Sequence, residues 1–273
     1  MPLGAVRRIQ VATNSERREK VCIIIPLCNE EASLLHLGTS LRDVKAKLND
    51  DFNVCFVLVD DGSIDNTLKL LPSVIPLGAQ YTVVVHQTNK GVGAACRSGF
   101  LHAWNADFVC TIDADCTYGP EHLVRMVAEV RGGTADVIVA SPYHPEGTIE
   151  GVQPWRLTLS KQCSRLYRMA SPLKLYTYTS MFRVYRGAVV RDVRFQSDDF
   201  ISAVEILLSA VAQGYRVSEV PLTLHRRLAG VSKMRVLSTI CGHVKLLVEC
   251  LLAGHRTPRR LCAFKKTELI YVR

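Results

Sequence analysis

Cysteine pairs of the Cys-x-x-Cys type are absent from this sequence of 273 residues, although it contains ten cysteines. The cysteines stand singly, and several lie inside apolar runs, namely Cys22, Cys55, Cys110, Cys241 and Cys250. The spacing excludes the usual zinc and dithiol redox motifs. Isolated thiols in apolar surroundings instead predict buried free cysteines in a reducing compartment.

The sequence also lacks a secretory signal and an uninterrupted apolar segment of membrane-spanning length. The first apolar run, residues 21–27, is too short for a signal peptide and leads into a polar motif. Only residues 236–254 approach the length of a span, and His243, Lys245 and Glu249 interrupt them. We therefore expect a cytoplasmic protein whose residues 236–254 form an amphipathic helix, lying on a surface or packed on the domain.

No internal repeat or low-complexity tract is visible, and 48% of the residues are hydrophobic, which is enough for a full core. The formal net charge of +9 is concentrated near the two ends of the chain. This distribution indicates an anionic partner, and nucleic acid, a phosphorylated substrate and an anionic membrane surface all remain open. The basic residues concerned are Arg7, Arg8, Arg17, Arg18, Lys20, Arg226, Arg227, Lys233, Arg235, Arg256, Arg259, Arg260, Lys265 and Lys266.

Short β-branched runs alternate with segments of helical period through the first half of the chain. The predicted strands are residues 21–26, 54–60, 81–86, 108–113 and 136–140, and the predicted helices are 31–48, 66–75, 93–104 and 121–130. This alternation predicts a mostly parallel sheet with right-handed crossovers. Asn66 is expected to cap the second helix, and Pro120 to begin the fourth.

After residue 140 the pattern changes to a loop rich in proline and glycine, then a helix at 155–169. Strands near 181–185 and 216–224 flank a helix at 200–213. We divide the chain into a basic extension (1–20), one domain (21–235) and a helix with a basic tail (236–273). Within the domain, residues 21–140 are the expected nucleotide half and 141–235 the acceptor half.

The strongest functional signal is Asp113-Ala114-Asp115, which directly follows a predicted buried strand. Paired carboxylates at a strand end suit a hard divalent cation, and such a cation in turn binds a diphosphate. Further polar motifs occupy residues 26–30, 60–63 and 89–93, again at strand or helix ends. The carboxyl ends of parallel strands lie along one edge of the sheet, so these motifs predict a nucleotide site there.

In this order and spacing, the motifs resemble the inverting GT-A-fold glycosyltransferases of family 2, and within them the dolichol-phosphate and polyprenyl-phosphate mannose synthases. The resemblance spans residues 21–235 and implies a Rossmann-like α/β fold with helices on both faces of the sheet. It implies Mg²⁺ or Mn²⁺ at Asp113 and Asp115, with Thr117 where the family often has a glutamine ligand. The donor contacts that we expect are Pro26, Asn29, Glu30, Asp60, Asp61, Lys90, Gly91, Arg97, Asp113, Ala114 and Asp115.

Two of these motifs also indicate a function from their residues alone. A carboxylate at Asp60 or Asp61 can accept hydrogen bonds from a base or from ribose hydroxyls. Gly91 and Gly93 allow a close backbone approach at a helix N-terminus, and Arg97 lies about one turn further along the same face.

The acceptor half carries a second group of matches to the family. Arg156 and Ser160 match its acceptor-phosphate pair, and Arg227 and Lys233 match the arginine and lysine of a loop that closes over both substrates. Arg183 ends the segment Thr179-Ser180-Met181-Phe182-Arg183, which has methionine in place of the family's glycine. We assign Asp113, Asp115, Arg227 and Lys233 to catalysis, and Arg156, Ser160, Arg183 and Arg227 to the acceptor.

Two other positions bear on the acceptor. Pro142 stands where lipid-phosphate members have an arginine, which weakens the lipid reading. Glu205 matches a family acidic position, which can contact the sugar or form a buried ion pair. His86, His102 and His122 lie in or beside regular elements and are read as core or surface residues; a phosphate acceptor, already ionised, needs no general base.

These observations lead to one expected function and two alternatives. The expected protein is a cytoplasmic, metal-dependent glycosyltransferase at the membrane surface. It moves a hexose from GDP-mannose or UDP-glucose to polyprenyl or dolichyl phosphate, and nucleic acid is not an expected partner. One alternative is the same chemistry on a soluble acceptor in secondary metabolism. The other is a non-catalytic α/β module that binds nucleotide or nucleic acid.

Overall fold

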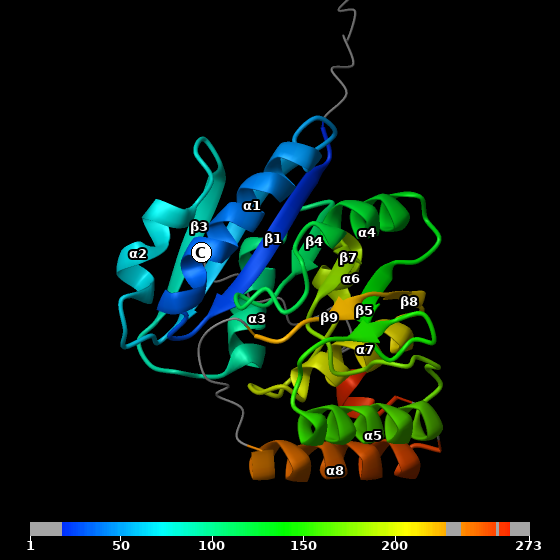
Figure 1. The fold of residues 1–273 in the computed structure, drawn as a ribbon. Coiled ribbons are helices and arrows are strands. Elements are labelled where there is room, and N and C mark those ends of the chain that lie inside the picture. Colours follow the sequence, from blue (N-terminus) through cyan, green and yellow to red (C-terminus); the bar gives the residue numbers. More distant parts are fainter. Residues whose placement is uncertain (1–17, 228–235, 255–256, 263–273) are drawn as a thin grey trace, which may run out of the picture.

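The centre of the protein is a seven-stranded sheet, in the strand order β3-β2-β1-β4-β7-β5-β8. The computed structural model describes residues 18–227, 236–254 and 257–262 (Figure 1). All neighbouring strands of this sheet are parallel except β7, which runs antiparallel to β4 and β5. The strands are β1 (Lys20–Leu27), β2 (Asn53–Asp61), β3 (Gln80–His86), β4 (Phe108–Thr111), β5 (Val137–Ser141), β7 (Arg183–Arg186) and β8 (Val217–Pro221), with β6 (Thr148–Ile149) and β9 (Thr223–Leu224) forming a separate pair.

Helices cover both faces of the sheet, as predicted (Figure 1). The side chains of β1 alternate between the two cores: Ile23 and Ile25 face α1, α2 and α4, whereas Cys22 and Ile24 face α3 and α7. Because both faces are covered, every strand residue from Val21 to Ile25 is buried. The helices are η1 (Glu31–Ser33), α1 (Leu34–Leu48), α2 (Thr67–Val74), α3 (Val92–His102), α4 (His122–Arg131), α5 (Pro154–Ala170), α6 (Gly187–Asp192), α7 (Ser202–Ala212), α8 (Val236–Leu252) and η2 (Arg259–Leu261).

Of the two predicted helix starts, Asn66 occupies the N-cap position of α2 as predicted, whereas Pro120 as the first residue of α4 is wrong. Asn66 precedes α2, but its side-chain amide donates to Glu31, and the Thr67 N–H is accepted by Asp65 Oδ1 at 2.9 Å. Pro120 is not the first residue of α4, because the chain makes a turn through Glu121 before the helix begins. A tertiary contact with Glu31 thus takes the place of a capping bond from the Asn66 side chain, and an extra turn moves the start of α4 beyond Pro120.

The C-terminal helix α8 lies beside α5 (Figure 1). Its Leu246 and Cys250 are fully buried, and so is Leu261 in η2. All three belong to the core that also contains α7. In the described residues, none of the helices combines the length and the apolar character that crossing a bilayer requires.

Candidate active site

A cavity of about 440 Å³ opens at the carboxyl ends of β1, β2 and β4. This is the sheet edge at which the polar motifs were predicted to meet. Residues from α3, from the 197–200 segment and from α8 complete its wall. The predicted site residues that line it are Pro26, Glu30, Asp61, Lys90, Gly91, Asp113, Ala114 and Arg227.

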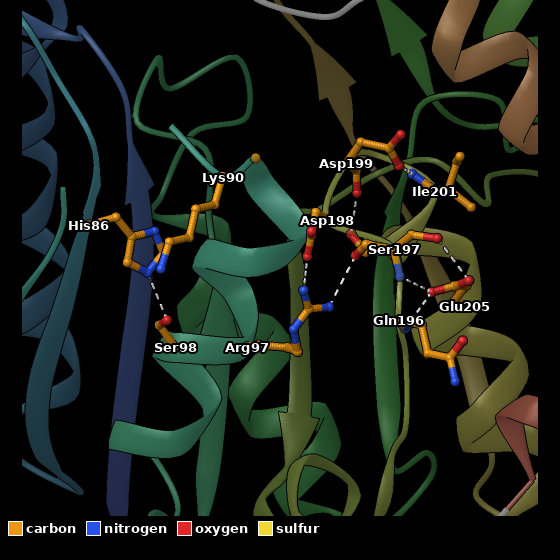
Figure 2. Close-up of polar contacts among 12 residues, drawn as sticks. His86, Lys90, Arg97, Ser98, Gln196, Ser197, Asp198, Asp199, Ile201 and Glu205 are labelled. Atoms are coloured by element: carbon orange, nitrogen blue, oxygen red, sulfur yellow. Dashed lines mark hydrogen bonds and ion pairs between the residues drawn. The ribbon is translucent and has the colours of Figure 1, made fainter. Parts of the chain in front are cut away.

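Asp61 is occupied by contacts within the protein. Its carboxylate accepts the backbone N–H of Lys90 at 2.9 Å and that of Gly91 at 2.7 Å. His86 Nδ1 lies 2.7 Å from the same carboxylate, and His86 Nε2 lies 2.9 Å from Ser98 Oγ (Figure 2). Asp61 therefore orders the turn before α3. His86, which the sequence led us to treat as a core or surface residue, positions Asp61.

The two glycines at the start of α3 allow another backbone segment of the protein to approach closely. Gly91 has a φ of +102°, and a Cβ there would lie 2.3 Å from the carbonyl oxygen of Asp198. At Gly93 a Cβ would lie 2.2 Å from the carbonyl oxygen of Ser197. The Gly93 N–H donates to the Asp198 oxygen at 2.6 Å, so the 197–198 backbone covers this helix N-terminus. The close approach predicted from the glycines is present, but with residues 197–198 as the partner.

Four predicted donor residues do not line this cavity, namely Asn29, Asp60, Arg97 and Asp115, the last of which pairs with Arg227. Arg97 points to the 197–198 segment, where it donates to Ser197 O and pairs with the Asp198 carboxylate (Figure 2). Asn29 accepts the Ile64 N–H at 2.7 Å and so fixes the turn after β2. Asp60 is buried, with Oδ1 lacking a hydrogen-bond partner among the described residues. Their expected contacts with the donor stay predictions.

Arg227 joins two carboxylates of the site. Its Nε donates to Asp115 Oδ2 at 2.6 Å, and its Nη2 lies 3.2 Å from Glu30 Oε1. Burial and then the neighbouring charge of Asp115 raise the pKa of Asp113 to about 7, against the opposing effect of Arg227. Asp113 and Asp115 thus place two carboxylates close together after the end of β4. The Arg227 guanidinium offsets part of their negative charge.

A second cavity, of about 170 Å³, lies next to the first. Asp113 and Phe200 line both. The second cavity is also lined by Thr117, by Pro142 and by Ser160, whose Oγ lies 2.7 Å from Thr179 Oγ1. Asp113 therefore stands between a cavity lined by predicted donor residues and one that contains a predicted acceptor residue.

The remaining predicted acceptor residues have different surroundings. Arg156 is half-buried, its guanidinium packs 5.1 Å from the Trp155 ring centre, and its buried Nε has no partner among the described residues. Arg183 is fully buried and donates to the carbonyl oxygens of Ala203 and Tyr178. The predicted contact of Arg183 with the acceptor is therefore wrong. Its guanidinium holds backbone carbonyl groups and does not line either cavity. Lys233 lies outside the described residues.

Glu205 is also fully buried. Of its two possible roles, the structure shows the buried one, because its carboxylate accepts hydrogen bonds from Gln196, Ser197 and Arg260.

The sequence did not point to several lining residues. Ser197, Asp198 and Asp199 reach the cavity from the segment before α7, and Ser238 and Thr239 reach it from α8. No local motif marks these residues, because packing between elements distant in sequence brings them to the site. Only the adjacent acidic pair at 198–199 could have served as a signal.

Comparison with known sequences identifies relatives of this chain. A family model described as Glycosyl transferase family 2 matches residues 22–194. Polyprenol monophosphomannose synthase of Mycolicibacterium smegmatis is 30% identical over 223 residues, covering 79% of this chain and 81% of that protein. Undecaprenyl-phosphate 4-deoxy-4-formamido-L-arabinose transferase of Klebsiella pneumoniae is 29% identical over 247 residues, covering 89% of this chain and 70% of that protein.

Solved structures resemble the fold at lower sequence identity. Glucosyl-3-phosphoglycerate synthase from Mycobacterium tuberculosis, in complex with Mn²⁺, UDP and phosphoglyceric acid, superposes with a TM-score of 0.63. The match has 17% sequence identity and covers 88% of this chain and 80% of that one. This likeness concerns the arrangement of helices and strands.

Proposed function

Because this chain belongs to glycosyl transferase family 2 and is a glycosyltransferase with the GT-A fold, we propose that it transfers a hexose to polyprenyl or dolichyl phosphate. GDP-mannose or UDP-glucose is the proposed donor, and the reaction inverts the anomeric configuration. The relatives from M. smegmatis and K. pneumoniae support a polyprenyl-phosphate acceptor by their names. The observation that carries the proposal is the place of Asp113 between two adjoining cavities.

The larger cavity is the proposed donor site. Lys90 reaches its wall from the turn that Asp61 orders, and it offers a cation to a diphosphate. The buried Oδ1 of Asp60 has no hydrogen-bond partner among the described residues. It can accept a hydrogen bond from a base N–H or a ribose hydroxyl of the nucleotide. Pro26, Glu30, Gly91 and Ala114 shape the wall around the nucleotide.

Asp113 and Asp115 are the proposed ligands of Mg²⁺ or Mn²⁺. The chemistry of these side chains fits a divalent cation, because paired carboxylates are hard oxygen ligands. Burial and then the charge of Asp115 raise the pKa of Asp113. Within the described ranges, no three acidic, histidine or cysteine side chains are grouped as a metal site. We propose that the diphosphate and water complete the coordination. A bound cation would stabilise the diphosphate as it leaves. Thr117 is a weaker candidate ligand, placed in the adjoining cavity.

The smaller cavity is the proposed position of the acceptor phosphate. Ser160 lines it, and Arg156 stands one helical turn earlier on α5. Arg227, on the donor side, and Lys233 are proposed to offset phosphate charge during transfer. A phosphate monoester is ionised near neutral pH, so positioning can suffice without a protein base.

A lipid acceptor also requires a membrane surface, for which we propose the outer side of α5 and α8. These helices lie side by side (Figure 1). They expose apolar side chains together with cations, a combination that suits an anionic bilayer at its cytoplasmic face. The exposed residues are Lys161, Arg165, Leu166 and Met169 on α5, and Val244, Lys245, Val248, Leu251 and Leu252 on α8.

A ligand screen tests the donor assignment. A ligand that binds only the folded state raises the melting temperature, so GDP, UDP and their sugar conjugates are compared with and without Mn²⁺. We expect one nucleotide series to raise the melting temperature, and more strongly with Mn²⁺. A protein that responds to none of them, but binds DNA in a salt-sensitive manner, would instead favour the nucleic-acid-binding alternative.

A further inference from the structure

The segment from Gln196 to Asp199 belongs to no helix or strand, and its residues 197–199 line the proposed donor cavity. On one side, the Asp198 carbonyl accepts the N–H of Gly93 at 2.6 Å, and Arg97 binds the same segment (Figure 2). These contacts join the segment to the start of α3. Its position therefore affects the turn through Gly91 as well as the cavity wall.

On the other side, the segment is held by Glu205 of α7. This carboxylate is fully buried and accepts the N–H of Gln196 and of Ser197, each at 2.8 Å, and the Ser197 hydroxyl at 2.9 Å (Figure 2). Two backbone donors and one hydroxyl thus converge on one carboxylate. A buried carboxylate of this kind needs such donors, and here they come from the cavity segment.

The fourth donor to Glu205 comes from beyond the C-terminal helix. Arg260 Nη1 lies 2.6 Å from Glu205 Oε1, and Arg260 Nε lies 2.6 Å from Glu249 Oε2 on α8. One guanidinium therefore links a buried carboxylate of α7 to a partly exposed carboxylate of α8. The planar fork of arginine is suited to holding two acceptors in fixed directions.

We propose that Arg260 is a positioning residue of the donor site. Because Arg260 joins Glu249 to Glu205, it couples the position of α8 to the order of the Gln196–Asp199 segment. The inference rests on the proposed function in that it takes the larger cavity as the nucleotide site. The inference adds that the ion pair between Arg260 and Glu249 of α8 affects nucleotide affinity, because Arg260 also binds Glu205.

A second feature of α8 supports the coupling. Ser238 and Thr239, at the other end of the same helix, line the cavity directly. A shift of α8 therefore displaces lining residues at its beginning and the Arg260 link near its end.

The test compares Arg260→Met, which removes the guanidinium and keeps most of the apolar stem, with Arg260→Lys, which keeps the charge. Arg125→Met is the matched control, because Arg125 makes an exposed ion pair with Glu129 on α4, away from the site. For each protein, the affinity for GDP and UDP with Mn²⁺ is measured by titration, and amide hydrogen exchange is followed in peptides that cover residues 196–199. Melting temperatures report on the fold.

We expect Arg260→Met to weaken nucleotide binding about tenfold and to speed exchange at 196–199, with Arg260→Lys between it and the wild type. Unchanged affinity together with faster exchange confined to α8 and residues 257–262 would overturn the proposal. If Arg260→Met does not fold, Glu249→Gln breaks only the α8 side of the link, and the same two measurements decide. If wild-type protein binds neither nucleotide, the proposed function fails, while the exchange pattern still tests the link.

Discussion

Arg227 Nε donates to Asp115 Oδ2 across 2.6 Å, although the two residues are 112 positions apart in the chain. The contact connects the loop after β9 to the Asp113-Ala114-Asp115 turn, and Glu30 extends it to the end of β1. Arg227, which we propose binds phosphate, thus contacts Asp115, one of the two proposed metal ligands. A charge change at either residue should affect the same step.

Replacing Asp115 by asparagine should abolish sugar transfer and leave the fold intact. Asparagine can still accept the Thr117 N–H that Asp115 Oδ1 accepts at 3.1 Å, but it removes the charge that binds a cation and Arg227. We expect a loss of about three orders of magnitude in kcat, or about 4 kcal/mol. Asp50→Asn, at an exposed position of the α1–β2 turn, is the control. Wild-type activity of Asp115→Asn in saturating Mn²⁺ would refute the assignment.

The fold of residues 21–140 could be predicted from the sequence, because its signals are local. Buried β-branched strands, helical periods and terminal polar motifs lie in sequence order, and each strand delivers its motif to one edge. The predicted strand at 216–224 instead divides into β8 and β9, and Asp113 lies beyond the end of β4. Such shifts at element ends are small but decide where side chains point.

The positions of side chains in residues 141–235 could not be predicted equally well, because their contacts depend on packing between segments distant in the sequence. Arg183 matched a family motif, yet it is buried against Ala203 and Tyr178. His86 lies at the end of an edge strand with no motif of its own, and only its contacts with Asp61 and Ser98 show its role. The link through Arg260 joins residues 55 positions apart and has no signature in the sequence.

Replacing Gly93 by alanine should damage the donor site through backbone displacement. A Cβ would meet the Ser197 carbonyl at 2.2 Å, so α3 and the 197–198 segment must separate. We expect about 1–3 kcal/mol of lost stability and clearly weaker nucleotide binding. Gly132→Ala, where the added Cβ would lie 3.4 Å from the Ala128 carbonyl oxygen, should have little effect on either. Chemical denaturation and nucleotide titration measure both quantities, and a fully stable, nucleotide-binding Gly93→Ala protein would contradict the geometry.

His243 should make stability depend on pH between neutral and mildly acidic conditions. Burial lowers the pKa of His243 from its ordinary value of 6.5, while the Asp199 charge opposes the shift. Below that ordinary value the unfolded state binds more protons, so the free energy of unfolding should fall as pH falls. His243→Gln removes the titrating ring. The denaturation midpoint of this variant should therefore fall less on acidification than that of the wild type. An identical pH dependence in both proteins would exclude this role of His243.

The outer side of α5 and α8 should bind anionic liposomes. Val248→Glu places a negative charge among the exposed apolar residues of α8 and should reduce co-sedimentation, whereas Leu77→Glu, at another exposed apolar site, should not. Raising the ionic strength should release wild-type protein, because salt screens the attraction of its cations. Equal binding to neutral and anionic liposomes would argue against the electrostatic part of this account.

Arg156 and Arg227 should both be needed for transfer to a phosphorylated lipid. Replacing either by alanine removes a guanidinium that we place near the acceptor phosphate, and we expect a loss of about two orders of magnitude, roughly 3 kcal/mol. Donor binding should suffer less in Arg156→Ala, because Arg156 stands on α5 and Arg227 lines the larger cavity. Arg226→Ala is the matched control for the loop, since Arg226 is exposed.

The central claim is tested most directly by transfer of labelled hexose from GDP-mannose or UDP-glucose to polyprenyl phosphate in the presence of Mn²⁺. The account predicts labelled lipid product with the wild-type protein and with Arg226→Ala, and its loss in Arg156→Ala and Arg227→Ala. A wild-type protein that labels no polyprenyl phosphate, yet glycosylates a neutral soluble acceptor, would contradict it.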